Sequence, residues 1–271
     1  MDKNAVISLL TDIFNKAPDN RLPGDNAGPI YDAPLFGFGA ADDALFSDFK
    51  KPEIIGPWHM NPVEWLPGAK CVVSMFFPFS KEVRDAHRKS RDTIAFEWLW
   101  ARVEGQALLD SMMKQAAQEL EAMGVKAIVP AVDSRFKAVQ GGKGGICGYA
   151  ELNESSFGST WSERHAAYVC GLGTFGLSKG LITEKGMAGR FASIIIDADI
   201  PADKRPYTGI YDYCSKCGAC IRRCPVGAIS MENGKDHLVC GPWVDKSKDT
   251  YAPRYGCGLC QTGVPCEYSK P

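Results

Sequence analysis

Three parts of the chain show apolar residues at helical spacing. The first, residues 4–16, ends before Pro18, and the longest spans residues 92–123. Gly124 follows that second segment at the position that favours glycine after a helix. Residues 162–170 form the third segment. The pattern therefore predicts three amphipathic helices.

Three shorter segments have the continuous apolar pattern of buried strands. They are residues 71–77, which Pro78 ends, residues 125–132 and residues 191–197. Pro130 interrupts the second of them, because proline has no backbone N–H to donate. Together with the helical segments, these strands predict an α+β fold.

The character of the sequence changes near residues 200–212. Helical and strand patterns are mixed before this point, whereas short turns and cysteines dominate after it. The predicted organisation is a mixed domain over residues 1–205, followed by a small cysteine-rich domain over residues 206–271.

Overall composition and charge narrow the function only slightly. Of 271 residues, 45% are hydrophobic, and 31 basic residues nearly balance 32 acidic ones, so bulk charge does not favour nucleic acid. No window approaches the roughly 18 apolar residues of a membrane span, and the N-terminus lacks the features of a signal peptide. We expect a cytoplasmic protein without membrane contact.

The 11 cysteines are the strongest chemical signal. Eight of them lie in the last 58 residues, whereas a disulfide framework is typical of short secreted chains. Pro225 directly follows the first four of the eight, which have the spacing Cys214-x2-Cys217-x2-Cys220-x3-Cys224. In bacterial ferredoxins with this spacing, three close cysteines hold one [4Fe–4S] cluster. The sequence therefore predicts an electron-transfer centre.

The fourth cysteine of this motif, expected at the start of a helix, ligates the other cluster in two-cluster ferredoxins. A second group of cysteines is therefore required, and the sequence contains one. We predict that one cluster is held by the first cysteine set, which is Cys214, Cys217, Cys220 and Cys266. The other cluster is predicted to be held by the second cysteine set, which is Cys224, Cys240, Cys257 and Cys260.

Zinc is the main alternative for these cysteines. Two cysteine pairs with a longer spacer would form a zinc ribbon, but three cysteines at x2 spacing followed by Cys-Pro fit a cubane better than a tetrahedral ion. Cys266 is the least regular ligand, because five residues separate it from Cys260 and the proline precedes it.

Glycine-rich motifs do not indicate nucleotide binding. Residues 171–176 match GxGxxG, but a helical pattern precedes them and further glycines follow, whereas the dinucleotide motif lies between a strand and a helix. Residues 141–145, GGKGG, lack the spacing of a phosphate-binding loop. Cys147 and Cys170, near these turns, are interpreted as small buried hydrophobic residues.

Three further motifs occur in order between residues 60 and 266. They are EWLPGAK at residues 64–70 before an apolar strand, Glu163-Arg164-x5-Cys170-Gly171-Leu172-Gly173-x2-Gly176, and Cys257-x2-Cys260-Gln261. In this order they resemble the epoxyqueuosine reductase family, whose core is shared with reductive dehalogenases. The resemblance implies a nitroreductase-like, cobalamin-binding domain beside two [4Fe–4S] clusters that reduce the corrinoid cobalt. It also implies cofactor contacts by Glu163, Arg164, Gly171, Leu172, Gly173 and Gly176.

The chain departs from the family pattern in three places. Phe157 occupies the position at which the family carries an aspartate proton donor, and Leu177-Ser178 replaces Lys-Asn after the glycine turn. The tRNA-acting members continue into a helical repeat, whereas this sequence ends at Pro271. We therefore expect a short, divergent relative that does not act on tRNA, and we assign no catalytic residue.

Three functions fit these patterns. The first, which we favour, is a reductase in which two clusters feed a corrinoid or a small substrate, with reduced ferredoxin or flavodoxin as electron donor. The second is an electron-transfer protein that reduces a partner such as a corrinoid protein. The third is a flavin-dependent reductase, because nitroreductase-like domains bind flavin elsewhere. His165 is then a candidate flavin contact or proton donor.

Overall fold

A four-stranded antiparallel sheet with the strand order β1-β2-β9-β3 forms the centre of the molecule. The structure is a computed structural model that describes residues 1–24, 27–141 and 143–271. The strands of the sheet are β1 (Leu35–Ala40), β2 (Cys71–Pro78), β9 (Gly189–Ile196) and β3 (Ala127–Ile128). All eight residues of β2 are buried, as its continuous apolar sequence predicts.

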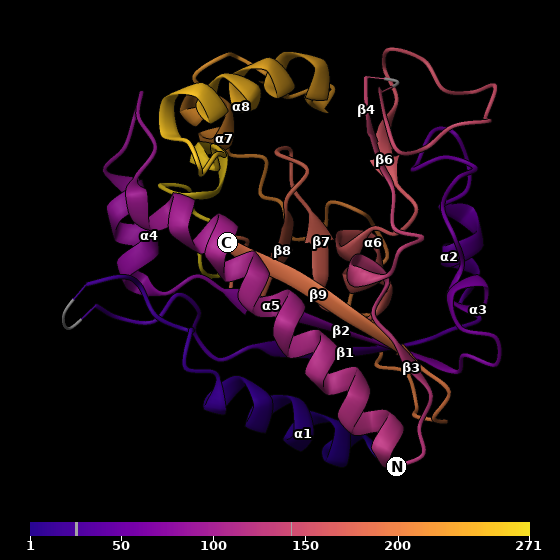
Figure 1. The fold of residues 1–271 in the computed structure, drawn as a ribbon. Helices are drawn as coiled ribbons and strands as arrows, with labels where there is room; N and C mark the ends of the chain where they lie inside the picture. Colours follow the sequence, from indigo (N-terminus) through magenta and orange to yellow (C-terminus); the bar gives the residue numbers. More distant parts are fainter. Residues whose placement is uncertain (25–26, 142) are drawn as a thin grey trace.

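Helices cover both faces of this sheet (Figure 1). One core contains Val73 and Ile194 of the sheet together with α1, α4 and α5, and the core on the other face contains Val72 and Ile195 together with α2, α3 and α6. Successive strand residues point to opposite faces, so each face has its own apolar core. The helices are α1 (Lys3–Lys16), α2 (Ala44–Asp48), α3 (Pro62–Trp65), α4 (Lys81–Arg88), α5 (Phe96–Ala122) and α6 (Glu163–Val169).

The long helix α5 begins later than predicted. It starts at Phe96 rather than at residue 92. The backbone N–H of Ile94 donates instead to the hydroxyl of Tyr251 at 3.1 Å, which holds this segment in an extended path. That partner is remote in sequence, so helical periodicity could not reveal it. At the other end Gly124 has a positive φ of 82°, as predicted for the residue after a helix.

The predicted strand at residues 125–132 is mostly absent. β3 has two residues, and the 3-10 helix η1 (Pro130–Val132) follows it. Pro130 is the first residue of η1, where a missing N–H is tolerated. β9 consequently pairs with β3 only at Ile195 and Ile196. No strand in the described part of the chain pairs with this edge of β9 from residue 189 to 194.

Smaller elements complete the fold. An arm of three strands consists of β4 (Ala138–Gln140), β5 (Lys143–Gly144) and β6 (Phe157–Ser159). A separate hairpin consists of β7 (Gly173–Phe175) and β8 (Leu181–Thr183). The C-terminal elements are α7 (Ala219–Arg223), β10 (Ile229–Ser230), β11 (Gly234–Lys235), α8 (His237–Tyr251) and η2 (Leu259–Gln261). Gly142 of the GGKGG turn lies outside the described residues. Within the described ranges, no helix combines the length and apolar character that crossing a membrane requires.

Candidate functional site

The four residues of the first cysteine set line a single pocket. Gly176, Leu177 and Met187 of the N-terminal part also line it, and it contains about 350 Å³ of empty space, part of which is open to solvent. Among the described residues, no three His, Cys, Asp or Glu side chains converge closely enough to hold a single metal ion. The fold therefore brings Cys266 to the other three cysteines, and their role as cluster ligands stays a prediction.

The tight loop from Cys214 to Cys220 bends around this pocket through two residues with positive φ. These are Lys216, with a φ of 52°, and Gly218, with a φ of 70°. Glycine adopts this conformation freely, whereas a lysine in it costs roughly 1–2 kcal/mol. The loop geometry is therefore determined by its surroundings as well as by its own sequence.

Main-chain hydrogen bonds position Cys266. The N–H of Met187 donates to the Cys266 carbonyl at 3.0 Å, and the N–H of Ala188 donates to the Glu267 carbonyl at 2.9 Å. Both donors lie in the turn before β9, so the C-terminal segment docks on the central sheet. This docking explains how the unusual five-residue spacing after Cys260 still delivers Cys266 to the pocket.

The second cysteine set lies around α7, α8 and η2. Cys224 directly follows α7 and ends it, which corrects the expectation that it begins a helix. Pro225 accounts for this end, because proline disfavours the helical conformation of the residue before it. Cys240 lies in the first turn of α8, Cys257 precedes η2 and Cys260 lies within η2.

The two sets adjoin, because Cys214, Cys220 and Cys224 pack against the apolar cluster that contains Cys260. Burial raises the pKa of Cys240; Lys235 opposes this effect, and charges on Cys260 and Cys224 add to it. Burial also raises the pKa of Cys257 to about 11, with contributions from Cys260 and Cys240. For Cys220 of the first set, burial raises the pKa to about 11 and the largest charge effect comes from Cys260. Cys220 and Cys260 therefore lie where the sets meet.

The cysteines of the first set have the properties of ligands for a cationic group that binds thiolates. Burial raises the pKa of Cys266 to about 12, and charges on Cys220, Cys214 and Cys217 oppose its ionisation as well. All 11 cysteines are free of disulfide bonds. Four neighbouring thiols become thiolates together only when a cation compensates their charge, which iron in a cluster does. The residues present thus fit iron–sulfur clusters.

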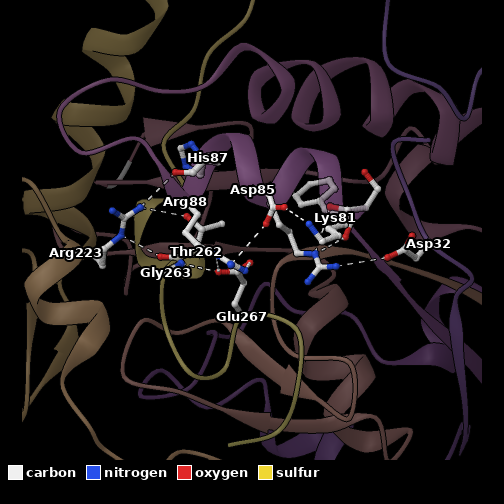
Figure 2. A network of polar contacts seen from close by, with 12 residues as sticks. Asp32, Lys81, Asp85, His87, Arg88, Arg223, Thr262, Gly263 and Glu267 are labelled. Atoms are coloured by element: carbon white, nitrogen blue, oxygen red, sulfur yellow. Dashed lines mark hydrogen bonds and ion pairs between the residues drawn. The ribbon is translucent and has the colours of Figure 1, made fainter. Parts of the chain in front are cut away.

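A polar network beside the cysteine loops ties them to α4 (Figure 2). We call the side chains of Arg88, Arg223 and Glu267 the clamp. Arg223 lies between two predicted ligands in α7 and donates to the carbonyl of Ser90 at 2.7 Å and to that of Thr262 at 3.0 Å. One guanidinium therefore joins α7 to the α4–α5 connection and to the loop before Cys266.

Glu267 is the buried member of the clamp. Its side chain is 2% exposed and accepts from Arg88 at 2.6 and 3.2 Å, whereas the side chain of Arg88 is 45% exposed. The N–H of Gly263 also donates to Glu267, at 2.6 Å. The sequence did not single out this contact, because 179 residues separate Arg88 from Glu267.

Arg164 lies in the first turn of α6, near Arg102 and Cys260. Its side chain is exposed to solvent. Burial nevertheless lowers its pKa; a charge on Cys260 opposes this effect and Arg102 adds to it. We call the region around Arg102, Arg164, Arg190 and Cys260 the recess.

The arm of β4 and β6 reaches the second cysteine set. The ring of Phe157 stacks on His237 at the start of α8, with 3.6 Å between ring centroids and 4° between planes. The side chain of Gln140 also approaches Gly241. The residue at the family's proton-donor position is thus an apolar contact to the helix that carries Cys240.

The glycine motif at residues 171–176 connects α6 to the β7–β8 hairpin. Gly171 has a positive φ of 81°, and a Cβ at Gly173 would collide with the carbonyl oxygen of Ile182. A Cβ at Gly176 would lie 3.8 Å from the sulfur of Cys214. A helix precedes the motif and β7 begins within it, whereas a dinucleotide-binding turn lies between a strand and a helix.

Two of the remaining cysteines were interpreted as buried. Cys170 is buried, and its sulfur donates to the carbonyl of Val72 at 3.3 Å. Cys147, in contrast, is exposed. It lies in the irregular connection between β5 and β6, where the surrounding residues are also mostly exposed, so the expectation was wrong at this position.

Glu163 points toward the sheet and not into solvent. Both carboxyl oxygens are buried without a hydrogen-bonding partner, and the nearby Trp161 Nε1 donates to Ser193 at 2.9 Å. Burial raises the pKa of Glu163 from 4.5 to about 8, and the charge of Asp110 adds to this effect. The carboxyl is therefore protonated in the folded protein at neutral pH.

This raised pKa predicts a pH-dependent stability. Between pH 4.5 and 8 the folded protein keeps a proton on Glu163 that the unfolded chain has released, so stability falls as the pH rises through this window. We expect Glu163→Gln to reduce this loss, measured as thermal midpoints of the cluster-loaded protein from pH 5 to 8.5. Glu121→Gln at an exposed position is the matched control, and equal pH profiles for the two variants would contradict the assignment.

His165 does not have the properties of an acid. Burial lowers its pKa to about 3, and His59 and Arg164 contribute to the decrease. Its Nδ1 lies 2.7 Å from the hydroxyl of Ser162. The imidazole is thus neutral at physiological pH and packs near Phe49 and Phe175.

Comparison with protein families identifies a 4Fe-4S binding domain over residues 207–230. This segment contains the four cysteines from Cys214 to Cys224 and ends before Cys240. A comparison of the sequence with curated proteins found no match. The predicted ferredoxin-type motif is therefore confirmed for its first four cysteines.

Solved structures with similar folds are epoxyqueuosine reductases and reductive dehalogenases. The epoxyqueuosine reductase from Streptococcus thermophilus gives a TM-score of 0.53 at 14% identity, over 98% of this chain and 66% of its own. An epoxyqueuosine reductase with an epoxyqueuosine-modified tRNA-Tyr stem loop gives 0.53 at 19% identity, over 97% and 66%. The catabolic reductive dehalogenase NpRdhA, in complex with 3-bromo-4-hydroxybenzoic acid, gives 0.52 at 17% identity, over 98% and 37%.

The chain thus has the mixed fold shared by these two groups of oxidoreductases, with a 4Fe-4S binding segment within it. This result confirms the resemblance at the level of the fold. The chain spans about two thirds of the length of the epoxyqueuosine reductases and about one third of the dehalogenase.

Proposed function

We propose that this protein is an iron–sulfur reductase that delivers electrons from two [4Fe–4S] clusters to a corrinoid bound in the recess. The observation that carries the proposal is the position of Cys260. Cys260 belongs to an apolar cluster against which Cys214, Cys220 and Cys224 pack, and it is also a charge neighbour of Arg164. This position supports an arrangement in which the second cysteine set lies next to the recess.

The eight cysteines would hold the clusters, and each cluster would supply low-potential electrons one at a time. The clamp keeps α7 and the last loop together, and the docking of Cys266 on the turn before β9 fixes the first set to the central sheet. The protein's own contribution is thus to hold the two sets adjacent and to place one of them at the recess.

Two features of the recess fit a corrinoid, whose ring periphery carries amide side chains. The edge of β9 that carries Arg190 has no strand partner from residue 189 to 194 within the described residues, and in this proposal its backbone groups pair with such amides. Arg164 supplies an accessible donor on the facing element. In this proposal residues 1–205 form a nitroreductase-like domain whose bound corrinoid supplies two-electron reductive chemistry.

The substrate is proposed to be a small reducible molecule other than epoxyqueuosine. Phe157 stacks on His237 where the family pattern has an acid, and His165 is neutral, so neither supplies a proton. A reduced ferredoxin or flavodoxin is the proposed electron donor, and tRNA is not a proposed partner. These assignments follow from the sequence departures and from the chemistry of the side chains.

A pigment and metal analysis tests this proposal. Anaerobically reconstituted protein is incubated with cobalamin, desalted, and examined by ultraviolet–visible spectroscopy with iron and cobalt quantified. We expect about eight iron atoms and about one cobalt atom per chain. About eight iron atoms without cobalt would favour an electron-transfer protein that reduces a partner, whereas a retained flavin would favour a flavin-dependent reductase. About four iron atoms would contradict the two-cluster assignment.

A further inference from the structure

Three arginines from three different elements meet at the recess. Arg102 lies in α5, Arg164 in α6 and Arg190 in β9. Nη2 of Arg190 donates to the main-chain carbonyl of Arg102 at 2.6 Å, and the guanidinium of Arg102 lies 4.7 Å from the centre of the Tyr255 ring. These contacts hold the guanidinium groups of Arg102 and Arg190, and the hydroxyl of Tyr31 is a further neighbour of Arg190.

No carboxylate is paired with these three guanidiniums in the part of the chain that the structure describes. The buried Nε atoms of Arg102 and Arg190 have no hydrogen-bonding partner. Burial lowers the pKa of Arg190 to about 10, and Arg102 and Arg164 are among the charges that lower it. The neighbouring Glu104 is already occupied, because it pairs with Arg254 at 2.6 Å.

Such an arrangement is unfavourable without a further anion. Cations that are partly removed from water need an opposite charge, and three that approach each other also repel. A cluster on the second cysteine set would offset part of this charge, because Cys260 is a charge neighbour of Arg164.

We propose that Arg102, Arg164 and Arg190 form a binding site for one oxyanion, a carboxylate or a phosphate, within the recess. Guanidinium groups match these anions with paired N–H donors, which a halide or a neutral group does not use. The anion has two possible sources, and both rest on the proposed function. One is an acid group of the substrate, and the other is the phosphodiester of a corrinoid that carries a nucleotide loop.

The binding of inorganic phosphate tests the site without any corrinoid. Phosphate is titrated into cluster-loaded protein in chloride buffer by calorimetry, for the wild type, Arg164→Gln and Arg190→Gln. We expect each variant to bind phosphate about tenfold more weakly or worse, because each loses charged hydrogen bonds. Arg21→Gln removes one exposed positive charge elsewhere and should bind like the wild type. Circular dichroism and iron content verify folding, and Arg164→Gln, at an exposed position, is the safer variant.

Two results would overturn the site. One is phosphate binding that is absent in the wild type or equal in the wild type and both recess variants. The other is unchanged phosphate binding accompanied by lower cluster reduction potentials in the variants, which would make the arginines counter-ions of the cluster. Specific phosphate binding in a protein that retains no cobalt would support the anion site while contradicting the corrinoid proposal.

A comparison of two corrinoids identifies the source of the anion. Cobinamide lacks the phosphodiester of cobalamin. If Arg164→Gln weakens cobalamin binding and leaves cobinamide binding unchanged, the site takes the corrinoid phosphate. If neither corrinoid is affected while phosphate binding is weakened, the site takes an acid group of the substrate. Both outcomes support the oxyanion site.

Discussion

Replacing Cys266 with alanine is expected to reduce the iron content from about eight to about four atoms per chain. Cys266 lines the same pocket as Cys214, Cys217 and Cys220, although its sequence spacing is irregular. A cubane that loses one of four thiolates at a half-buried site is expected to be lost during purification. The second cysteine set does not include Cys266, so its cluster should remain and give a single paramagnetic signal after reduction.

The controls for this prediction are two further cysteine variants. Cys147→Ala removes an exposed thiol outside both sets and should leave about eight iron atoms. Cys260→Ala should remove the other cluster and leave the signal of the first. An unchanged iron content in Cys266→Ala, with the native circular dichroism spectrum, would show that Cys266 is not a ligand and that the pocket arises from packing alone.

Replacing Arg88 with methionine is expected to lower the thermal midpoint of the cluster-loaded protein by roughly 5–10 °C. The change leaves the carboxylate of Glu267, which is 2% exposed, with the N–H of Gly263 as its main remaining partner. An unpaired buried charge is costly, whereas methionine retains much of the volume of the arginine stem. Because cluster loss makes unfolding irreversible, thermal midpoints of loaded protein at one scan rate are the appropriate measurement.

Two variants separate the charge effect from packing. Adding Glu267→Gln to Arg88→Met removes the buried charge, so the double variant should be more stable than Arg88→Met alone. Lys81→Met breaks the exposed pair with Asp85 on the same helix and should change stability by less than about 1 kcal/mol. If Arg88→Met were no less stable than Lys81→Met, the clamp would not stabilise the cysteine loops.

The Cys266 and Arg88 variants test two separate properties, cluster binding and the attachment of the cysteine loops to the large domain. The cysteine variants examine the chemistry of the sets, whereas Arg88→Met examines the contact that attaches them to the large domain. A loss of iron in Arg88→Met would further indicate that α4 helps to retain the first cluster, since Glu267 directly follows Cys266. The two effects can be distinguished because Arg88 itself is not in either cysteine set.

The helices and central strands could be predicted from local pattern. Residues 71–77 and 191–197 are apolar enough to identify β2 and β9, and the periodicity of residues 4–16 identifies α1. The predicted element boundaries were wrong at the start of α5 and at Pro130. The hydroxyl of Tyr251 accepts a hydrogen bond from the N–H of Ile94, so α5 begins later than predicted. Pro130 begins η1 where a strand was expected.

The sequence alone determined the 4Fe-4S binding motif of this protein, because metal-ligand spacing is a local property of the chain. The spacing from Cys214 to Cys224 indicates a cubane whether or not the rest of the fold is known. The order of the glycine motif and the later cysteines also identified the fold group. These signals need no long-range contact to be recognised.

Only the tertiary structure decided what surrounds that chemistry. Arg102, Arg164 and Arg190 lie on three elements; the family resemblance singled out Arg164, but nothing in the local sequence connects it to the other two. Glu267 and Arg88 likewise meet only when α4 and the last loop pack together. The charge of a recess and the burial of an ion pair depend on distances between remote segments, and no local pattern encodes those distances.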